Sequence, residues 1–170
     1  KPSSAASDVY KRQVESLNRT NVDAYGVEIG GTHDLPFDIA NLEFSYSYLD
    51  MKDLKNPDMP ILYRSKHTVK GSIIKPIVKD INFSLSFNYK SVQQYEDFLS
   101  DDHPVIDNIF RFPIKKIPDT ILFDLEVSKS FTNYKITGMV RNIFDKKYVL
   151  IQHYPMPGRT WQINFTKHIQ

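Results

Sequence analysis

Apolar and polar residues alternate one by one along most of the chain from Val22 onward. This period of two is typical of β-strands, because successive side chains of a strand point to opposite faces of a sheet. The alternation is cleanest in four segments: residues 41–48, 80–89, 120–131 and 161–166. It is less strict in three more: residues 23–35, 62–77 and 134–149. The pattern therefore predicts seven strands.

The connections between these strands alternate between short and long. Tight turns are expected at residues 36–40, 76–80 and 131–134. Longer loops are expected at residues 53–61, 96–118 and 150–158. Helix signals are weak throughout. The chain is thus expected to run up and down as an antiparallel sheet, with short turns at one end and long loops at the other.

The predicted strands are long, and their polar faces are unusual for a soluble core. Several run for about 10 residues, whereas soluble strands usually have about 5 to 6. A face of Ser, Asn, Gln, Glu and Lys would be a costly protein core but is acceptable beside a wet lumen. Aromatic residues recur near the strand ends, at Tyr25, Tyr48, Tyr89, Tyr95, Phe131, Tyr134, Tyr148 and Trp161.

This combination is the signature of an all-β, antiparallel up-and-down transmembrane β-barrel with aromatic girdles. We expect only about seven strands of such a barrel, which is an incomplete barrel wall. The alternative is a soluble β-sandwich or β-barrel ligand-binding domain, in which the apolar face would pack against a second sheet.

Composition and charge exclude several classes of protein. The 170 residues include 11 Phe and 10 Tyr but no Cys, which excludes a disulfide scaffold and a thiolate metal site. No apolar run approaches the ~20 residues of a spanning helix. Three of the 22 basic and one of the 20 acidic residues lie in residues 1–13, so the remainder carries equal numbers of both signs. Such a balance does not indicate nucleic-acid binding.

Residues 1–13 differ from the rest of the chain. The Ser- and Ala-rich start has no apolar period, and Asp8 to Gln13 reads DVYKRQ, the translation of a transposon end used in library preparation. We expect these residues to be non-native, with an ordinary disordered tail as the alternative. The interpretable protein then covers residues 14–170, and we expect its true amino-terminal portion to be missing.

Four motifs resemble the TonB-dependent outer-membrane receptors, over nearly all of residues 14–166. Three are weaker: the strand from Asn21 to Glu28, which contains Gly26, the following Tyr46-Ser47-Tyr48-Leu49-Asp50, and the basic run Arg64-Ser65-Lys66-His67. The strongest is Asn142-Ile143-Phe144-Asp145-Lys146-Lys147-Tyr148, followed by Pro155-Met156-Pro157-Gly158-Arg159 and a terminal alternating strand.

The residues of the strongest motif suggest structural rather than ligand-binding roles. Asn142 and Asp145 can bond nearby backbone groups where a strand ends. Gly158 is expected to provide a positive-φ turn, and Arg159 is expected to pair with a carboxylate. The family signature is thus Gly26, Glu28, Asn142, Phe144, Asp145, Tyr148, Pro157, Gly158 and Arg159.

The resemblance implies a function and a location. Members of this family close about 22 strands around a plug, so the predicted strands would be the last seven. It implies uptake of a ferric siderophore or a cobalamin across the bacterial outer membrane, without a cofactor. The implied partners are outer-membrane lipid, the missing amino-terminal plug and remaining strands, and TonB through that plug.

The long loops supply the candidate ligand-binding residues, since the resemblance places loops against the substrate. They are Tyr95, Asp101, Asp102, His103, Arg111, His153 and Tyr154. Asp101, Asp102 and His103 are a conceivable cation site, but an acidic run in a loop is usually a solvated surface. A barrel enzyme such as an outer-membrane lipase or protease lacks any convincing Ser-His or carboxylate constellation here. We therefore expect a protein that is not an enzyme.

Overall fold

The computed structural model describes residues 21–100, 105–106, 109–110 and 112–167. Residues 1–13, expected to be non-native, lie outside this part of the chain. Within it, no helix has both the length and the apolar character needed to cross a membrane.

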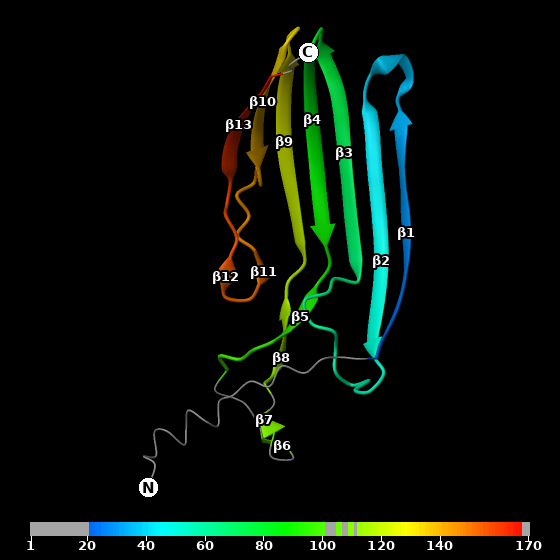
Figure 1. The fold of residues 1–170 in the computed structure, drawn as a ribbon, viewed down its shortest axis with the longest axis vertical. Helices are drawn as coiled ribbons and strands as arrows, with labels where there is room; N and C mark the ends of the chain where they lie inside the picture. The colour runs from blue at the N-terminus through cyan, green and yellow to red at the C-terminus, as the bar shows by residue number, and fades with distance from the viewer. Residues whose placement is uncertain (1–20, 101–104, 107–108, 111, 168–170) are drawn as a thin grey trace, which may run out of the picture.

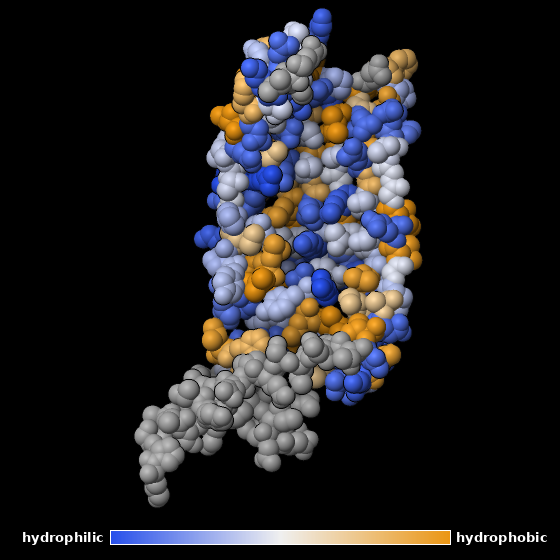
Figure 2. Space-filling model, viewed as in Figure 1, coloured by the Kyte–Doolittle hydropathy of each residue, from blue (hydrophilic) through white to orange (hydrophobic). Residues whose placement is uncertain are grey.

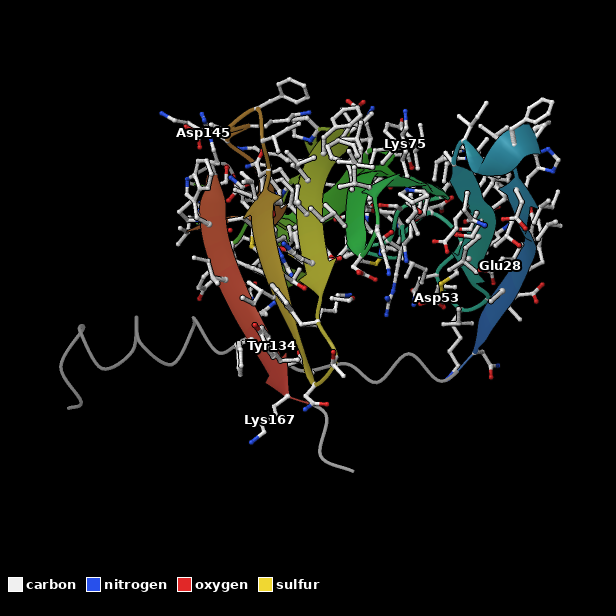
Figure 3. The ribbon with its side chains drawn as sticks, turned by 90° about the horizontal axis from the view of Figure 1, so that it is seen from above. Glu28, Asp53, Lys75, Tyr134, Asp145 and Lys167 are labelled. Atoms are coloured by element: carbon white, nitrogen blue, oxygen red, sulfur yellow. The ribbon has the colours of Figure 1, made fainter. Side chains whose placement is uncertain are left out.

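One antiparallel sheet dominates the structure, and its strands follow chain order (Figure 1). Its seven strands are β1 (Val22–Asp34), β2 (Asn41–Asp53), β3 (His67–Val78), β4 (Ile81–Lys90), β9 (Thr120–Ser130), β10 (Tyr134–Arg141) and β13 (Thr160–Lys167). The predicted number of strands and their antiparallel order are confirmed. The sheet is curved and open, with β1 and β13 at its two ends, so it is a wall and not a closed barrel (Figure 3).

Two predicted strand ends were wrong, and each is explained by backbone conformation. The strand expected from residue 62 begins at His67, because Tyr63 has a φ of 56° that no strand accommodates. The strand expected to reach residue 149 ends at Arg141, because Asn142 has a φ of 51°. In contrast, β2 runs past its predicted end to Asp53, which pairs with Val22.

The two ends of the sheet differ as predicted. Short connections lie at the upper end in Figure 1 and include the 3-10 turn η1 (Pro36–Asp38). Long connections lie at the lower end and contain three small ladders. They pair β5 (Gln93–Glu96) with β8 (Ile114–Ile117), β6 (Val105–Ile106) with β7 (Ile109–Phe110), and β11 (Val149–Ile151) with β12 (Tyr154–Pro155). Strands of two to four residues are too short for alternation to predict them.

Strand register collects the apolar positions on one face of the sheet. Tyr46 is opposite Val69, which is opposite Tyr89, and directly opposite residues share a face. The same registers place these side chains on that face: Tyr25, Val27, Ile29, Leu42, Phe44, Tyr46, Tyr48, Val69, Ile73, Phe83, Leu85, Phe87, Tyr89, Phe123, Leu125, Val127, Ile136, Val140, Trp161, Ile163 and Phe165.

The apolar face is uncovered in the part of the chain that the structure describes. Trp161 is 76% exposed and Ile163 is 82% exposed, and no large side chain of the described ranges is fully buried. No second sheet packs on this face within those ranges, as a soluble sandwich would require. An apolar surface of this extent is stable where it contacts lipid.

The opposite face is mostly polar. Figure 2 shows polar side chains across the middle of the sheet, with apolar side chains toward its margins. The registers assign to this face Glu28, Glu43, Ser45, Ser47, Thr68, Lys70, Ser72, Asn82, Ser84, Ser86, Asn88, Asp124, Glu126, Ser128, Thr137, Arg141, Gln162 and Asn164. The wall is therefore two-faced along its whole width.

Aromatic rings gather near both ends of the apolar face. Near the short turns, the ring of Tyr134 stacks on Phe131 at 4.3 Å and on Phe165 at 5.5 Å. Near the long loops, the centroid of the Tyr48 ring lies 6.2 Å from that of the Tyr25 ring and 5.3 Å from that of the His67 ring. Two aromatic belts at the ends of an apolar band match the girdles expected of a membrane barrel.

Candidate functional site

The long-loop end holds most of the polar contacts that the strands themselves do not make. There β5 and β8 pair from Gln93–Ile117 to Glu96–Ile114, extending β4 and β9 beyond the main sheet. We call this extension, residues 93–97 and 113–117, the first arm. It has a small apolar core, in which Tyr95 is 5% exposed and Ile117 is 3% exposed.

The loop between β2 and β3 is bound to the first arm. The Tyr63 backbone N–H donates to the Gln94 carbonyl at 2.8 Å, and the Gln93 side-chain amide donates to the Ser65 hydroxyl at 2.8 Å. The Tyr63 ring lies 6.4 Å from the Tyr95 ring. Burial raises the pKa of the Tyr63 hydroxyl, with smaller electrostatic contributions from Tyr95 and Asp97. Tyr63 is therefore uncharged at neutral pH.

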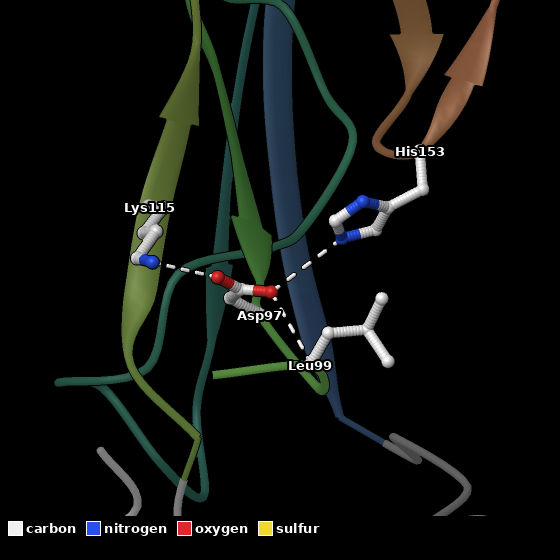
Figure 4. A network of polar contacts seen from close by, with 4 residues as sticks. All are labelled: Asp97, Leu99, Lys115 and His153. Atoms are coloured by element: carbon white, nitrogen blue, oxygen red, sulfur yellow. Dashed lines mark hydrogen bonds and ion pairs between the residues drawn. The ribbon is translucent and has the colours of Figure 1, made fainter. Parts of the chain in front are cut away.

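Asp97 follows β5 and is the centre of a polar network (Figure 4). Lys115 Nζ donates to its Oδ2 at 2.6 Å, and the Leu99 backbone N–H donates to its Oδ1 at 3.3 Å. His153 Nε2 lies 3.6 Å from the same Oδ1. The hydrogen bond from Lys115 lowers the pKa of the Asp97 carboxyl, while burial opposes this effect. Asp97 is thus a carboxylate at neutral pH, although its side chain is only 9% exposed.

A second set of polar contacts fixes the turn after β10. The Asn142 backbone N–H donates to Asp124 Oδ1, on β9, at 2.8 Å. The Asn142 side chain closes a ring with Lys146, since its Nδ2 donates to the Lys146 carbonyl and its Oδ1 accepts from the Lys146 N–H, both at 2.9 Å. Asn142 is 5% exposed, and asparagine tolerates its φ of 51° better than most residues.

The signature continues into the last strand through Asp145, whose Oδ1 accepts the Arg159 backbone N–H at 2.7 Å. A Cβ at position 158 would collide with the Asp145 carboxylate, so any other residue there would displace the side chain that accepts the Arg159 N–H. The expected positive-φ turn at Gly158 was wrong, since no described glycine has a positive φ. Glycine is needed here for close approach. Arg159 contacts the Asp145 carboxylate through its backbone N–H and not through the side-chain pairing that was expected.

We call Asp124, Asn142, Asp145, Lys146 and Gly158, with the Arg159 N–H, the clasp. Tyr148 adds to it, because its carbonyl accepts the Met156 N–H at 3.0 Å and closes the base of the β11–β12 hairpin. Phe144 is 71% exposed and packs edge-on against Phe123 at 5.4 Å. Gly26 resembles Gly158, because a Cβ there would collide with the Tyr48 carbonyl of β2.

The loop residues predicted to bind ligand are only partly brought together. His153 joins the Asp97 network, and Tyr154 next to it is 69% exposed. Tyr95 is buried in the first arm. Asp101, Asp102, His103 and Arg111 lie outside the described residues. The ranges that the structure covers contain no group of three side chains suited to hold a metal ion.

Sequence reasoning missed Asp97 and Lys115. An Asp just after a strand is a common turn former through its bond to the N–H two residues on, which is what Asp97 makes to Leu99. That local signal marks a turn. It does not indicate the partner Lys115, 18 residues away, because the pairing depends on the β5–β8 ladder.

The polar face of the wall has a hollow of about 560 Å³ over β1 to β4 and β9. Its lining includes Thr32, Glu43, Ser45, Lys70, Ser72 and Asp124. The Glu43 carboxylate accepts a hydrogen bond from the Ser72 hydroxyl at 2.9 Å. The lining carries the charged residues Glu43, Lys70 and Asp124 beside the apolar residues Phe44 and Phe87.

No family model matches the sequence. Among solved structures, the chain is similar to the ferric-catecholate import receptor Fiu from E. coli K12, with a TM-score of 0.66 and 14% identity over 87% of this chain and 21% of that chain. The siderophore receptor PirA from Acinetobacter baumannii matches with a TM-score of 0.64 and 16% identity, over 85% of this chain and 21% of that chain. The copper transporter OprC matches with a TM-score of 0.63 and 16% identity, over 85% of this chain and 24% of that chain.

The fold is that of part of a β-barrel wall. The solved structures it resembles are TonB-dependent receptors, and the match is to a carboxy-terminal part of such a barrel, as the motifs around Asn142 and Gly158 predict. The chain spans about a fifth of the length of the first two of these structures. At these identities the likeness establishes the fold and leaves cargo and partners to be argued separately.

Proposed function

We propose that the chain forms the carboxy-terminal wall of an outer-membrane receptor that imports a large, scarce nutrient. The supporting observation is the two-faced sheet, with its exposed apolar face and its polar, hollowed opposite face. Such a wall is stable with lipid on one side and a wet or plugged lumen on the other. The proposed location is therefore the bacterial outer membrane.

The proposed cargo is a ferric siderophore, with a cobalamin as the alternative outcome. Fiu and PirA, which share the fold, are described as receptors for a ferric catecholate and a siderophore. No described residue decides between the two classes of cargo. Tyr95, Asp101, Asp102, His103, Arg111, His153 and Tyr154 remain the loop positions proposed to contact it.

The proposed partners follow from the polar face. Charged residues there, such as Glu43, Lys70 and Asp124, would hydrate the wall or hold a plug contributed by another part of the receptor. TonB would act through that plug. In this proposal residues 14–170 belong to the barrel, and residues 1–13 do not.

An uptake experiment tests the proposal. The complete gene is expressed in iron-starved cells that lack their own siderophore receptors, and uptake of radioactive iron is measured with a ferric catecholate. Uptake should require the gene and should stop in a host that lacks TonB. A protein that stays in solution without detergent, or uptake that is equal in both hosts, would contradict the proposal. Cobalamin supplied in place of the catecholate tests the alternative cargo.

A further inference from the structure

Three lysines interrupt the apolar face of the sheet near its short-turn end. Lys75 lies on β3, Lys129 on β9 and Lys167 on β13, and all three are exposed. Their register partners are apolar or aromatic: Phe83, Ile81, Ile136 and Tyr134. A charged side chain on a lipid-facing surface is costly in the middle of a membrane and tolerated near its interfaces. The position of these lysines along the strands therefore matters.

The three lysines are displaced from one another by a constant step. The register of Lys75 leads across β4 to Val127, two residues before Lys129. The register of Lys129 leads across β10 to Phe165, two residues before Lys167. Successive lysines are two strands apart in the sheet, so the step is one residue per strand.

This step keeps the lysines at one depth in a membrane. Barrel strands are tilted by about 35–45° and lie about 4.8 Å apart, so a line parallel to the membrane shifts by about one residue on each successive strand. The short turns shift in the same direction. Asp34, the last residue of β1, is in register with Ile74 across β2, and β3 continues four residues farther to Val78. The lysines therefore follow the inner edge of the apolar band.

Charge differs between the two ends of the apolar face. Near the long loops, Lys66 is paired with Asp50 at 2.6 Å, and the Tyr25 hydroxyl donates to the same carboxylate. Near the short turns, no acidic residue of the seven strands shares the face with the three lysines. None of the three takes part in an ion pair among the described residues. Their ammonium groups can therefore bind an anion from outside the wall.

Aromatic rings lie beside the middle lysine. Lys129 Nζ is 5.1 Å from the centroid of the Phe131 ring. That ring stacks on Tyr134, which in turn stacks on Phe165. Aromatic rings of this kind are enriched where lipid headgroups meet the acyl chains. An ammonium group next to such a stack matches a phospholipid, with its phosphate near the lysine and its acyl chains along the apolar face.

We propose that Lys75, Lys129 and Lys167 form a belt that binds the headgroups of anionic phospholipids, in the leaflet at the short-turn end. The inference rests on the proposed placement of the wall in a membrane, and it names the lipid at this rim. The ammonium groups donate to phosphate oxygens. A headgroup with a net negative charge is preferred to a zwitterionic one, because the ammonium of the latter repels a second cation.

The test measures which lipid gathers beside the belt. Val127→Cys places a thiol on the apolar face in register with Lys75, at a side chain that is 43% exposed, and the sequence contains no cysteine of its own. The complete receptor, freed of any cysteine elsewhere, is labelled there with bimane and placed in phosphatidylcholine vesicles. A small fraction of phosphatidylglycerol with brominated acyl chains should quench the label about fivefold more strongly than the same fraction of brominated phosphatidylcholine, as expected for one lysine near a membrane surface.

Substitutions at the belt separate charge from general contact with lipid. Replacing Lys75, Lys129 and Lys167 with glutamine should make the two brominated lipids quench equally, whereas arginine at the same positions should keep the preference. The matched control is Lys70→Gln with Lys135→Gln, which removes two lysines of the polar face on β3 and β10. This control should keep the full preference. Unchanged quenching by brominated phosphatidylcholine shows that each variant is folded in the membrane.

The outcomes distinguish the belt from the import function. Equal quenching by the two lipids in the receptor with its lysines intact would overturn the belt and leave import standing. A preference that survives the glutamine variant, or that the control loses as well, would also overturn it. A preserved preference in a receptor that takes up no ferric catecholate would support the belt and reject import. No quenching by either lipid would mean that Val127 does not face lipid, and would overturn both.

Discussion

Asp97 shows how one side chain can organise a loop that has almost no regular structure. Its carboxylate accepts hydrogen bonds from the Lys115 ammonium and the Leu99 backbone N–H, and His153 Nε2 lies 3.6 Å from it. The ammonium of Lys115 contributes most to lowering its pKa, and burial acts in the opposite direction. The carboxylate consequently stays charged at a pH where a free aspartate would be partly protonated.

This lowered pKa makes the first arm sensitive to strong acid. Because the pKa of Asp97 in the folded protein lies below its ordinary value of 3.8, its contribution to stability is complete above pH 3.8. That contribution is lost as the pH falls through the lowered pKa. An NMR titration of the Asp97 carboxyl carbon should give a midpoint below 3.8, and Lys115→Met should move the midpoint upward. A midpoint at or above 3.8 would show that Lys115 does not bind Asp97.

At the scale of elements, the clasp explains why the last hairpin has a fixed outer turn. Strand β10 stops because Asn142 and Asp145 take φ values of 51° and 53°, which direct the chain out of the sheet. Their side chains then bond backbone groups across the turn. The turn is therefore held by hydrogen bonds within the loop and by the hydrogen bond from the Asn142 N–H to Asp124 on β9.

Asn142→Ala should destabilise the protein by about 1–3 kcal/mol, because it removes both side-chain hydrogen bonds and leaves the Lys146 N–H and carbonyl without these partners. Urea unfolding in lipid vesicles measures the free energy. Asn142→Gly is the control, since it loses the same bonds but accepts the positive φ. We expect a smaller loss for glycine than for alanine. Equal losses would mean that the backbone conformation adds no strain, and no loss in either variant would contradict the clasp.

On the scale of the whole molecule, the two faces of the wall face two different environments. The registers place Leu85 opposite Leu125 on the apolar face and Ser84 opposite Glu126 on the polar face. Of two neighbouring residues on one strand, one therefore has to be apolar and the other polar. The two end strands, β1 and β13, each have one edge unpaired in the described part of the chain, and lipid cannot satisfy such edges.

A lysine placed at adjacent positions of β4 measures this difference. Leu85→Lys puts a charge on the apolar face in the middle of the strand and should cost about 2–4 kcal/mol of stability in a bilayer. Ser84→Lys puts the same side chain on the polar face, opposite Glu126, and should cost much less. Folding of the complete receptor into vesicles, followed by denaturant titration, gives both values. Equal costs would mean that both faces are wet, as in a soluble protein.

Much of the wall was predictable, because its signal is local. The seven strands, their antiparallel order and the division of short and long connections all agree with the alternation pattern. The small hairpins β5–β8 and β11–β12 were not predicted, since they are short and carry little alternation. Of the candidate ligand residues, His153 lies in the polar network and Tyr95 is buried, and neither position follows from sequence.

The sequence by itself determined which residues share a face, because side chains in a strand alternate regardless of what the strand pairs with. It also determined that the strands joined by short turns are antiparallel, because short turns allow no other arrangement. Only the tertiary structure decided why residue 158 is glycine, since the Asp145 carboxylate lies against it. It alone brought Asp97 to His153, 56 positions apart in the sequence, because such contacts depend on how separate loops are placed and not on any local period.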